Sequence, residues 1–197
     1  MIDRREQILI AAQGIANESG LSAMTVRNVA ERAAIGASTL RHYFPTQQAL
    51  YDAVVGRSFD SQLSDRRIRD RRVGAARRLV ECLAQFLPEH ERDRHRLDGW
   101  VGLYAAAVGP ARTDAGGRLL SSLAGHARTR VDGWLAVLDS ESRLQPGSRE
   151  QHTTTCLALV DGLCLGLVAR PAEVSVAEAH AVLADVVTRA VVADGVH

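Results

Sequence analysis

The chain has 197 residues, enough to bury a sizeable hydrophobic core and to form one small and one medium domain. Its net charge is only +1, and its hydrophobic content of 46% and charged content of 24% are ordinary for a globular protein. The longest apolar run, residues 156–169, is interrupted by Asp161 and is too short to span a bilayer, and no signal-peptide pattern opens the chain. The three cysteines are scattered, as is typical of reduced thiols. We therefore expect a cytoplasmic protein with no membrane-spanning part.

Apolar residues recur at helical spacing along almost the whole chain, which predicts an all-α fold of about nine helices. The first predicted helix covers residues 4–18, and Gly20 suits its C-terminal end. Thr25 is placed to cap a second helix, and a third covers residues 37–43. A fourth opens at Pro45-Thr46 and continues past Val54.

The net charge is distributed unevenly along the chain. Residues 1–52 carry five Arg against five acidic residues, residues 53–78 carry eight against three, and residues 79–197 carry eleven against fifteen. Within the basic part, residues 65–78 are the most highly charged. This composition is typical of a solvated helix end and connector, and a second DNA-contact patch is the alternative.

Further helices are predicted in the C-terminal part, at about residues 79–87, 97–108 and 113–138, the last loosened by Gly116-Gly117. The final two begin at Ser148 and Ser175. In each case a Gln or Glu follows three residues later, which is the spacing of a capping box.

The last two helices carry more apolar surface than one small domain can cover. We interpret this excess as the interface of a homodimer built on a four-helix bundle, with a monomer core as the alternative. The candidate interface residues are Leu159, Leu163, Val182, Val186, Val187 and Ala190.

The first 50 residues resemble the N-terminal domain of TetR-family transcriptional regulators. The matching positions are Ile8-Leu9, Ala11-Ala12, Gly20, Thr25, Val29-Ala30, Ala33-Ala34-Ile35, Thr39-Leu40, Phe44-Pro45 and Ala49-Leu50. The resemblance implies a helix-turn-helix at about residues 25–44 in a DNA-binding domain of residues 1–52. Residues 53–197 would then form a ligand-binding and dimerisation domain. In this family two heads of a dimer read a palindromic operator, and most members are repressors that a small molecule releases.

Four positions depart from the common family pattern. Ala34 stands where glycine usually helps the turn, and this places mild strain there if the residue is left-handed. Gly36 replaces a serine cap, Arg41 replaces a frequent tyrosine, and Gln47 replaces a frequent lysine. These departures affect the contact assignments more than the family resemblance.

The DNA contacts follow from which side of the third helix faces inward. Leu40 and Phe44 should face the core, so the other positions face DNA. Arg41 is suited either to guanine O6 and N7 or to a phosphate. The candidate DNA-binding residues are Thr25, Arg27, Ala37, Ser38, Thr39, Arg41, His42, Tyr43, Thr46 and Gln47.

The segment from residue 157 to residue 187 resembles the C-terminal domain of the BetI-like branch of the family, mainly through Leu159-Val160-Asp161-Gly162-Leu163 and Pro171. The resemblance implies an unidentified small-molecule effector. Aromatic faces favour a cation, so a quaternary ammonium ligand is one hypothesis. The candidate pocket residues are Phe86, Trp100, Tyr104, His126 and Trp134.

Two other function classes compete with a ligand-responsive regulator. A helical enzyme is disfavoured because the chain has no phosphate loop, zinc-type spacing or nucleophile turn, so we predict no catalytic residues, cofactor or metal. A metal- or thiol-sensing regulator is the other class. Cys156 and Cys164 lie eight residues apart, and we interpret them as buried structural thiols.

Overall fold

The computed structural model describes residues 3–19, 23–110 and 112–193, so the expected helix stop at Gly20 lies outside the described residues. Nine α-helices form in this part of the chain, and the all-α prediction is confirmed. The chain divides into two compact units, residues 1–62 and 63–197, which are called the head and the body below. The boundary expected at residue 52 falls inside a helix of the head.

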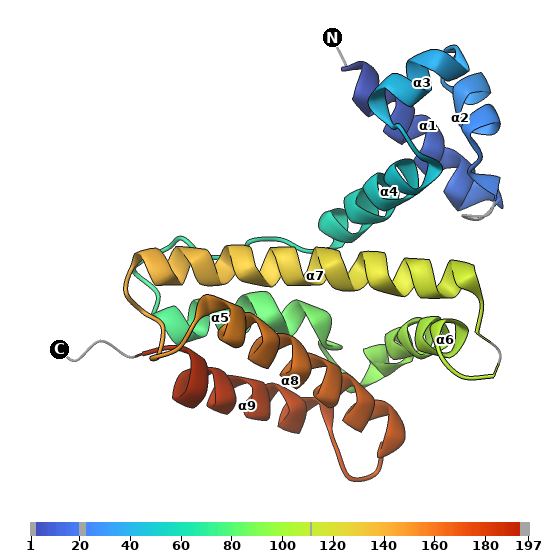
Figure 1. Cartoon of the computed structure of the whole chain (residues 1–197). Coiled ribbons are helices and arrows are strands. Elements are labelled where there is room, and N and C mark those ends of the chain that lie inside the picture. The colour runs from blue at the N-terminus through green and yellow to red at the C-terminus, as the bar shows by residue number, and fades with distance from the viewer. Residues whose placement is uncertain (1–2, 20–22, 111, 194–197) are drawn as a thin grey trace. The chain divides into compact units, whose positions relative to one another are not determined.

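The head consists of α1 (Arg4–Ser19), α2 (Val26–Arg32), α3 (Ala37–Tyr43) and α4 (Gln47–Gln62). In Figure 1 these four helices form the blue-to-teal unit, in which α1 lies against α2 and α4. Its core is a single apolar cluster with contributions from every helix. The cluster includes Ile8, Ala12, Met24, Val29, Leu40, Phe44, Leu50 and Val54.

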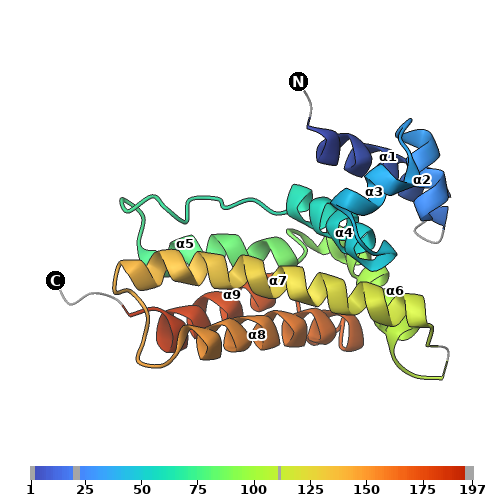
Figure 2. The ribbon, with the colours of Figure 1, turned by 45° about the horizontal axis from the view of Figure 1, so that its top comes forward.

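The body begins with α5 (Ala75–Leu83) and the short 3₁₀ helices η2 (Ala84–Phe86) and η3 (Glu91–Arg96). It continues with α6 (Leu97–Ala107), the long α7 (Asp114–Ser140), α8 (Arg149–Ala169) and α9 (Val176–Val186). A π-helical turn, η4 (Val187–Val191), ends the described helices. As Figures 1 and 2 show, α7 and α8 run antiparallel side by side, and α5 and α9 pack within the same unit.

Both predicted capping boxes are present. The Ser148 hydroxyl accepts from the Gln151 amide and the Ser175 hydroxyl from the Glu178 amide, while each Gln or Glu side chain accepts from its cap residue's backbone N–H. These reciprocal bonds satisfy amides that the first turn leaves unpaired, which is why the sequence located both helix starts correctly.

By length and composition, α8 is the one described helix that is long and apolar enough to cross a membrane. The 14-residue apolar run at residues 156–169 is the C-terminal part of this 21-residue helix. The same helix buries His152, Thr153, Cys156, Val160, Cys164 and Leu167 in the body, which a core helix also does.

Candidate DNA-binding surface and effector region

The turn between α2 and α3 has small residues on both sides of the half-buried Ile35. The Asn28 amide donates to the Thr25 hydroxyl at 3.2 Å, so the predicted cap of α2 is confirmed. Ala34, two residues after α2 ends, has φ = 51° and is therefore left-handed. Gly36 caps α3 without a side-chain bond. The seven-residue α3 is consequently held by its neighbours more than by its own ends.

The inner anchors of α3 lie where the sequence predicted them. Leu40 and Phe44 are buried in the head core, and Tyr43 is half-buried with its ring edge against His42. The opposite face is solvent-exposed and carries the remaining predicted contacts. These exposed residues are Ala37, Ser38, Thr39, Arg41 and His42.

Most arginines of the head are engaged within it. Arg32 forms a bidentate pair with Glu18 at 2.5 Å, and Arg57 pairs with Glu6. Arg4 donates to Gln7, and the Arg5 guanidinium lies over the Phe44 ring. In the described part of the head, this leaves two arginines without an ion pair, a hydrogen bond or an aromatic ring contact, Arg27 and Arg41. Both were predicted to contact DNA.

The predicted contacts at the start of α4 also have roles inside the head. The Thr46 hydroxyl accepts from the Ala49 amide at 3.0 Å and so caps α4. The Gln47 side chain donates to the Met24 carbonyl oxygen at 3.4 Å. Sequence reasoning missed this second bond because its partner lies 23 residues away.

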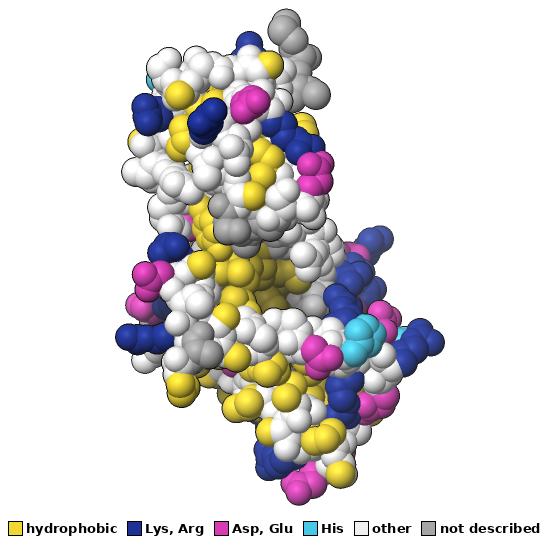
Figure 3. Space-filling model, turned by 90° about the vertical axis from the view of Figure 1, so that its right-hand side faces the viewer, with side chains coloured by type: hydrophobic (Ala, Val, Ile, Leu, Met, Phe, Trp, Pro, Cys, Tyr) yellow, Lys and Arg dark blue, Asp and Glu magenta, His cyan; other side chains and the backbone are white. Residues whose placement is uncertain are grey.

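The charge pattern of the head agrees with its composition. Figure 3 shows basic and acidic side chains side by side on the unit that carries the N-terminus, with neither sign covering the visible face. Residues 1–52 were predicted to be neutral, and bulk charge therefore contributes little to DNA affinity. Positioned contacts must supply the rest.

The predicted pocket residues lie in the body, and four of them form two aromatic pairs. The Phe86 and Trp134 rings meet edge to face with their centroids 6.2 Å apart, and Trp100 and Tyr104 lie 4.5 Å apart. The structure places His126 half-buried on α7. Burial raises the pKa of Tyr104, and the nearby charges of Asp161 and Cys164 raise it further.

The two aromatic pairs differ in how much surface they offer a ligand. Trp134 is only 2% exposed, and its indole N–H donates to a carboxylate oxygen of Asp65 at 2.9 Å, so it belongs to the core. Trp100 and Tyr104 keep part of their surface exposed.

The predicted interface residues are divided between core and surface. Val182 is 45% exposed and Ala190 is exposed, whereas Leu159, Leu163 and Val186 are half-buried. Val187 is fully buried in the body core and presents no surface to a partner, so it has to be removed from the set. Leu165, which sequence reasoning missed, is 57% exposed on α8.

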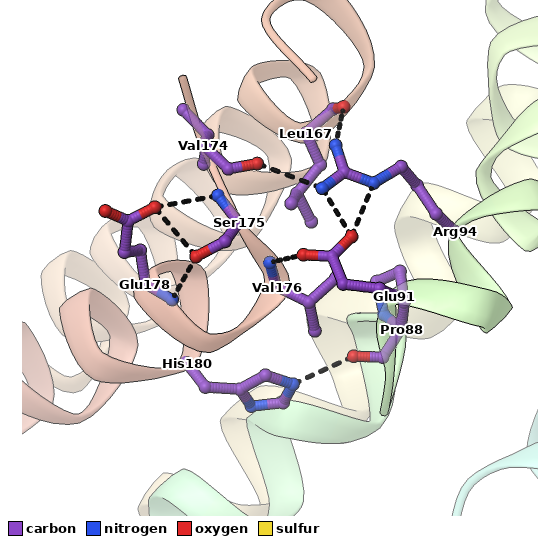
Figure 4. Close-up of polar contacts among 9 residues, drawn as sticks. All are labelled: Pro88, Glu91, Arg94, Leu167, Val174, Ser175, Val176, Glu178 and His180. Atoms are coloured by element: carbon purple, nitrogen blue, oxygen red, sulfur yellow. Dashed lines mark hydrogen bonds and ion pairs between the residues drawn. The ribbon is translucent and has the colours of Figure 1, made fainter. Parts of the chain in front are cut away.

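A polar cluster joins the segment before α6 to the turn between α8 and α9 (Figure 4). Glu91 accepts from the Val176 amide at 2.6 Å, at the start of α9, and pairs with Arg94. Arg94 donates to the carbonyl oxygens of Leu167 and Val174 at 2.8 and 3.1 Å. The acidic Glu91 thus bonds to the N-terminal end of α9, and the basic Arg94 bonds to the C-terminal end of α8. Each side chain has the charge that the helix dipole favours at that end. This set of contacts, residues 91 and 94 with 167, 174 and 176, is called the clip below.

The three cysteines are buried, as predicted for Cys156 and Cys164, and burial is the main cause that raises the pKa of each thiol to about 12. Thiolates are the reactive and metal-binding form, so these side chains are poorly suited to redox sensing at neutral pH. Among the described residues, no group of three or more His, Cys, Asp or Glu side chains is placed to hold a metal ion.

Comparison with known proteins gives two family matches. Residues 75–192 match the C-terminal family of BetI-type transcriptional repressors, and residues 8–54 match the tetR family of bacterial regulatory proteins. The chain is 26% identical to the HTH-type transcriptional regulator PksA of Bacillus subtilis over 176 residues, which cover 87% of this chain and 82% of PksA. It is 29% identical to the HTH-type transcriptional repressor KstR of Rhodococcus jostii over 132 residues, which cover 66% of this chain and 62% of KstR.

Solved structures show the same fold. A putative transcriptional regulator from Saccharomonospora viridis, crystallised with choline, superposes with a TM-score of 0.54 over 96% of this chain and 98% of that one. The two chains are 17% identical, so this likeness concerns the fold alone.

Proposed function

The chain belongs to the TetR family and carries a BetI-type C-terminal domain, so it is a DNA-binding transcriptional regulator of the repressor type and not an enzyme. We propose that its residues perform this function as follows. Two copies pair through α8 and α9, and their α3 helices read the two halves of a palindromic operator. A small molecule bound in the body releases the DNA.

The exposed face of α3 is the observation that carries the DNA-reading proposal. Ala37 and Ser38 are small and lie one helical turn before Arg41, so the backbone can approach the base edges closely while the guanidinium extends between them. Arg41 has no partner of its own among the described residues, and its fork geometry matches guanine O6 and N7. We therefore assign Arg41 to a guanine and Arg27 to a phosphate.

The DNA-reading proposal is tested by retaining genomic DNA fragments on the purified protein and sequencing them. Affinity for the recovered operator should fall as salt concentration rises. In a panel of single-base variants, Arg41→Ala should lose about 1–3 kcal/mol of discrimination at one position of each half-site. Arg189→Ala, which removes the same charge from the body, should leave discrimination unchanged. Equal weakening at every base would contradict the guanine assignment, and retention of no fragment would refute the DNA-reading proposal.

The dimer proposal is supported by an exposed stripe along α8 and its neighbour α9. Ala158 and Leu165 on α8 are exposed two turns apart, and Val182 is exposed on α9. Small and apolar residues at this spacing suit a helix-to-helix interface with a second copy, which removes their surface from water.

The effector proposal is supported by the half-exposed pair of Trp100 and Tyr104 on α6. Their aromatic faces suit a cationic ligand, and the Saccharomonospora viridis regulator of the same fold was crystallised with choline. Choline at millimolar concentration should raise the melting temperature of the protein. The neutral isostere 3,3-dimethylbutan-1-ol serves as the control, and an equal shift with both compounds, or none with either, would argue against a cationic effector.

A further inference from the structure

We infer that Ser64 and Asp65 form an anchor that fixes where the chain leaves the body towards the head, and that Asp65 and Trp134 are positioning residues for operator binding. The inference rests on the proposed function, because it concerns how two heads are held ready for one operator. Neither the DNA-reading proposal nor the effector proposal assigns an anchoring role to these residues.

The anchor residues follow α4 almost immediately. Asp65 accepts from the Trp134 indole N–H at 2.9 Å and from Arg130 at 3.2 Å, and its backbone oxygen lies 3.3 Å from the Cys82 sulfur. Gln85 accepts from the Ser64 amide at 2.9 Å and donates to the Ser64 carbonyl at 2.8 Å. The side chains of α7 and of the α5–η2 segment therefore hold both residues from two sides.

The anchor shortens the free chain between the two units. While Ser64 is held, one residue, Leu63, separates it from the end of α4, which allows about 3.5 Å of extended chain. Without the anchor, the next residue fixed by burial is Ile68, whose carbonyl accepts from Arg78 at 2.6 Å, because Arg67 before it is tied to the body only by an exposed ion pair with Glu81. Five residues of free chain would then reach about 17 Å.

That difference in reach matters for a dimeric reader. Half-sites in major grooves one turn apart are separated by about 34 Å, and two loosely tethered heads lose conformational freedom when they bind them. A short tether restricts the heads before binding and so reduces that entropic loss.

Trp134 connects the anchor to the region predicted for the effector. Its ring is 2% exposed and packs edge to face against Phe86, whose backbone oxygen lies 3.7 Å from the Cys164 sulfur on α8. The indole N–H is its one polar group, and Asp65 is the partner that satisfies it. A ligand that shifts this ring also shifts the donor on which the anchor depends.

Five variants of the full-length protein test the inference, one of them the double substitution Asp65→Ala/Trp134→Phe. Asp65→Ala removes the acceptor without removing an apolar core side chain, and Trp134→Phe removes the donor. Asp65→Ala/Gln85→Leu removes both parts of the anchor. The control is Asp132→Asn, which lies two residues from Trp134 on α7 and removes an exposed ion pair with Arg149.

The first measurement is backbone hydrogen exchange over residues 60–68, which needs no DNA. Asp65→Ala should exchange faster there than wild type and the control, and Asp65→Ala/Gln85→Leu should exchange faster still. Exchange at the wild-type rate in both would overturn the anchor. This result is decisive even if the wild-type protein retains no DNA and the proposed function fails.

The second measurement is affinity for the recovered operator, with dimer mass checked by light scattering. We expect the dissociation constant to rise about threefold in Asp65→Ala and about tenfold in Asp65→Ala/Gln85→Leu, the latter corresponding to about 1.4 kcal/mol. Trp134→Phe should weaken binding in the wild-type background and have no further effect in the Asp65→Ala background. Faster exchange with unchanged operator affinity, or independent effects of the two substitutions, would overturn the positioning role.

Discussion

Ala34 gives a test at the scale of one residue. Its φ of 51° is left-handed, which is the condition under which the sequence predicted strain there, and a Cβ in that region costs about 1 kcal/mol. Ala34→Gly should therefore stabilise the head by about 0.5–1 kcal/mol, measured by urea unfolding.

The neighbouring alanine is the control for that measurement. Ala33 has φ = −80° and caps the end of α2 in the right-handed region, where glycine adds backbone entropy to the unfolded state and loses a methyl group that packs on the head core. Ala33→Gly should destabilise the head by about 0.5–1 kcal/mol. If the two substitutions changed stability in the same direction, strain at Ala34 would be contradicted.

The sequence predicted which side of α3 faces solvent, because helical spacing and the two anchors Leu40 and Phe44 determine it. It did not predict which arginines stay free. The Arg32–Glu18 and Arg57–Glu6 pairs join residues 14 and 51 positions apart, and only the folded head brings them together. Only these ion pairs in the folded head single out Arg27 and Arg41 as the arginines available for DNA contacts.

Gly116 tests the packing of two helices. A Cβ at this position would lie 2.2 Å from the carbonyl oxygen of Ala106, so α6 and α7 can approach closely only with glycine there. Gly116→Ala must push the helices apart and should destabilise the body by about 1–3 kcal/mol in urea unfolding.

The next residue supplies a matched control. Gly117 has open space at its Cβ position, and α7 runs through both glycines instead of being loosened by them. Gly117→Ala should stabilise the body by about 0.5–1 kcal/mol through helix propensity. Destabilisation of similar size by both substitutions would show that the close approach at Gly116 is not the cause.

The clip predicts a pH dependence at the scale of one inter-element contact. The Val176 amide and then Arg94 lower the pKa of Glu91 from its ordinary value, so the carboxylate is the stabilising form (Figure 4). The contribution of this carboxylate to folding stability is complete above the ordinary carboxyl pKa. It is lost as the pH falls through the lowered pKa of the folded state. Glu91→Gln should therefore melt earlier than wild type at neutral pH, and the gap should close in acid.

Glu89→Gln is the control for the clip, because Glu89 lies two residues away with 83% of its side chain exposed. It should melt close to wild type at every pH. A gap between Glu91→Gln and wild type that does not change with pH would mean that the carboxylate charge has no part in the clip.

Elements with strong local signals were predicted well, and those set by distant partners were not. The capping boxes located α8 and α9, whereas α5 begins at Ala75, four residues before the predicted start. Its first turn buries Ala75 and Arg78, and the Arg78 guanidinium pairs with Glu141 at 2.6 Å. From the sequence alone, Arg78 is expected to be exposed to solvent. Its partner Glu141 lies 63 positions away, so local sequence does not predict the burial of Arg78.

At the scale of the whole molecule, the basic segment at residues 65–78 has a different role from a free cationic patch. Five of its seven arginines are paired with carboxylates in the described body, through Asp70, Glu81 and Glu141. Exposed pairs of this kind contribute little stability individually. Together with the anchor, they fix the connector to the body, which supports the interpretation as a connector over a second DNA-contact patch.

Dimerisation gives the prediction for the whole molecule. A neutral head that offers few free arginines should bind half an operator weakly, so affinity depends on two heads acting together.

Leu165→Glu places a charge on the exposed stripe of α8, where a second copy would bury it at high energetic cost. Because the side chain is 57% exposed in one chain, folding should be unaffected. We expect the variant to be a folded monomer by light scattering and circular dichroism, with operator affinity at least tenfold weaker. Val108→Glu, at a 56% exposed position beyond the stripe, should remain dimeric and bind normally. A dimeric Leu165→Glu protein with wild-type affinity would place the dimer interface on another surface.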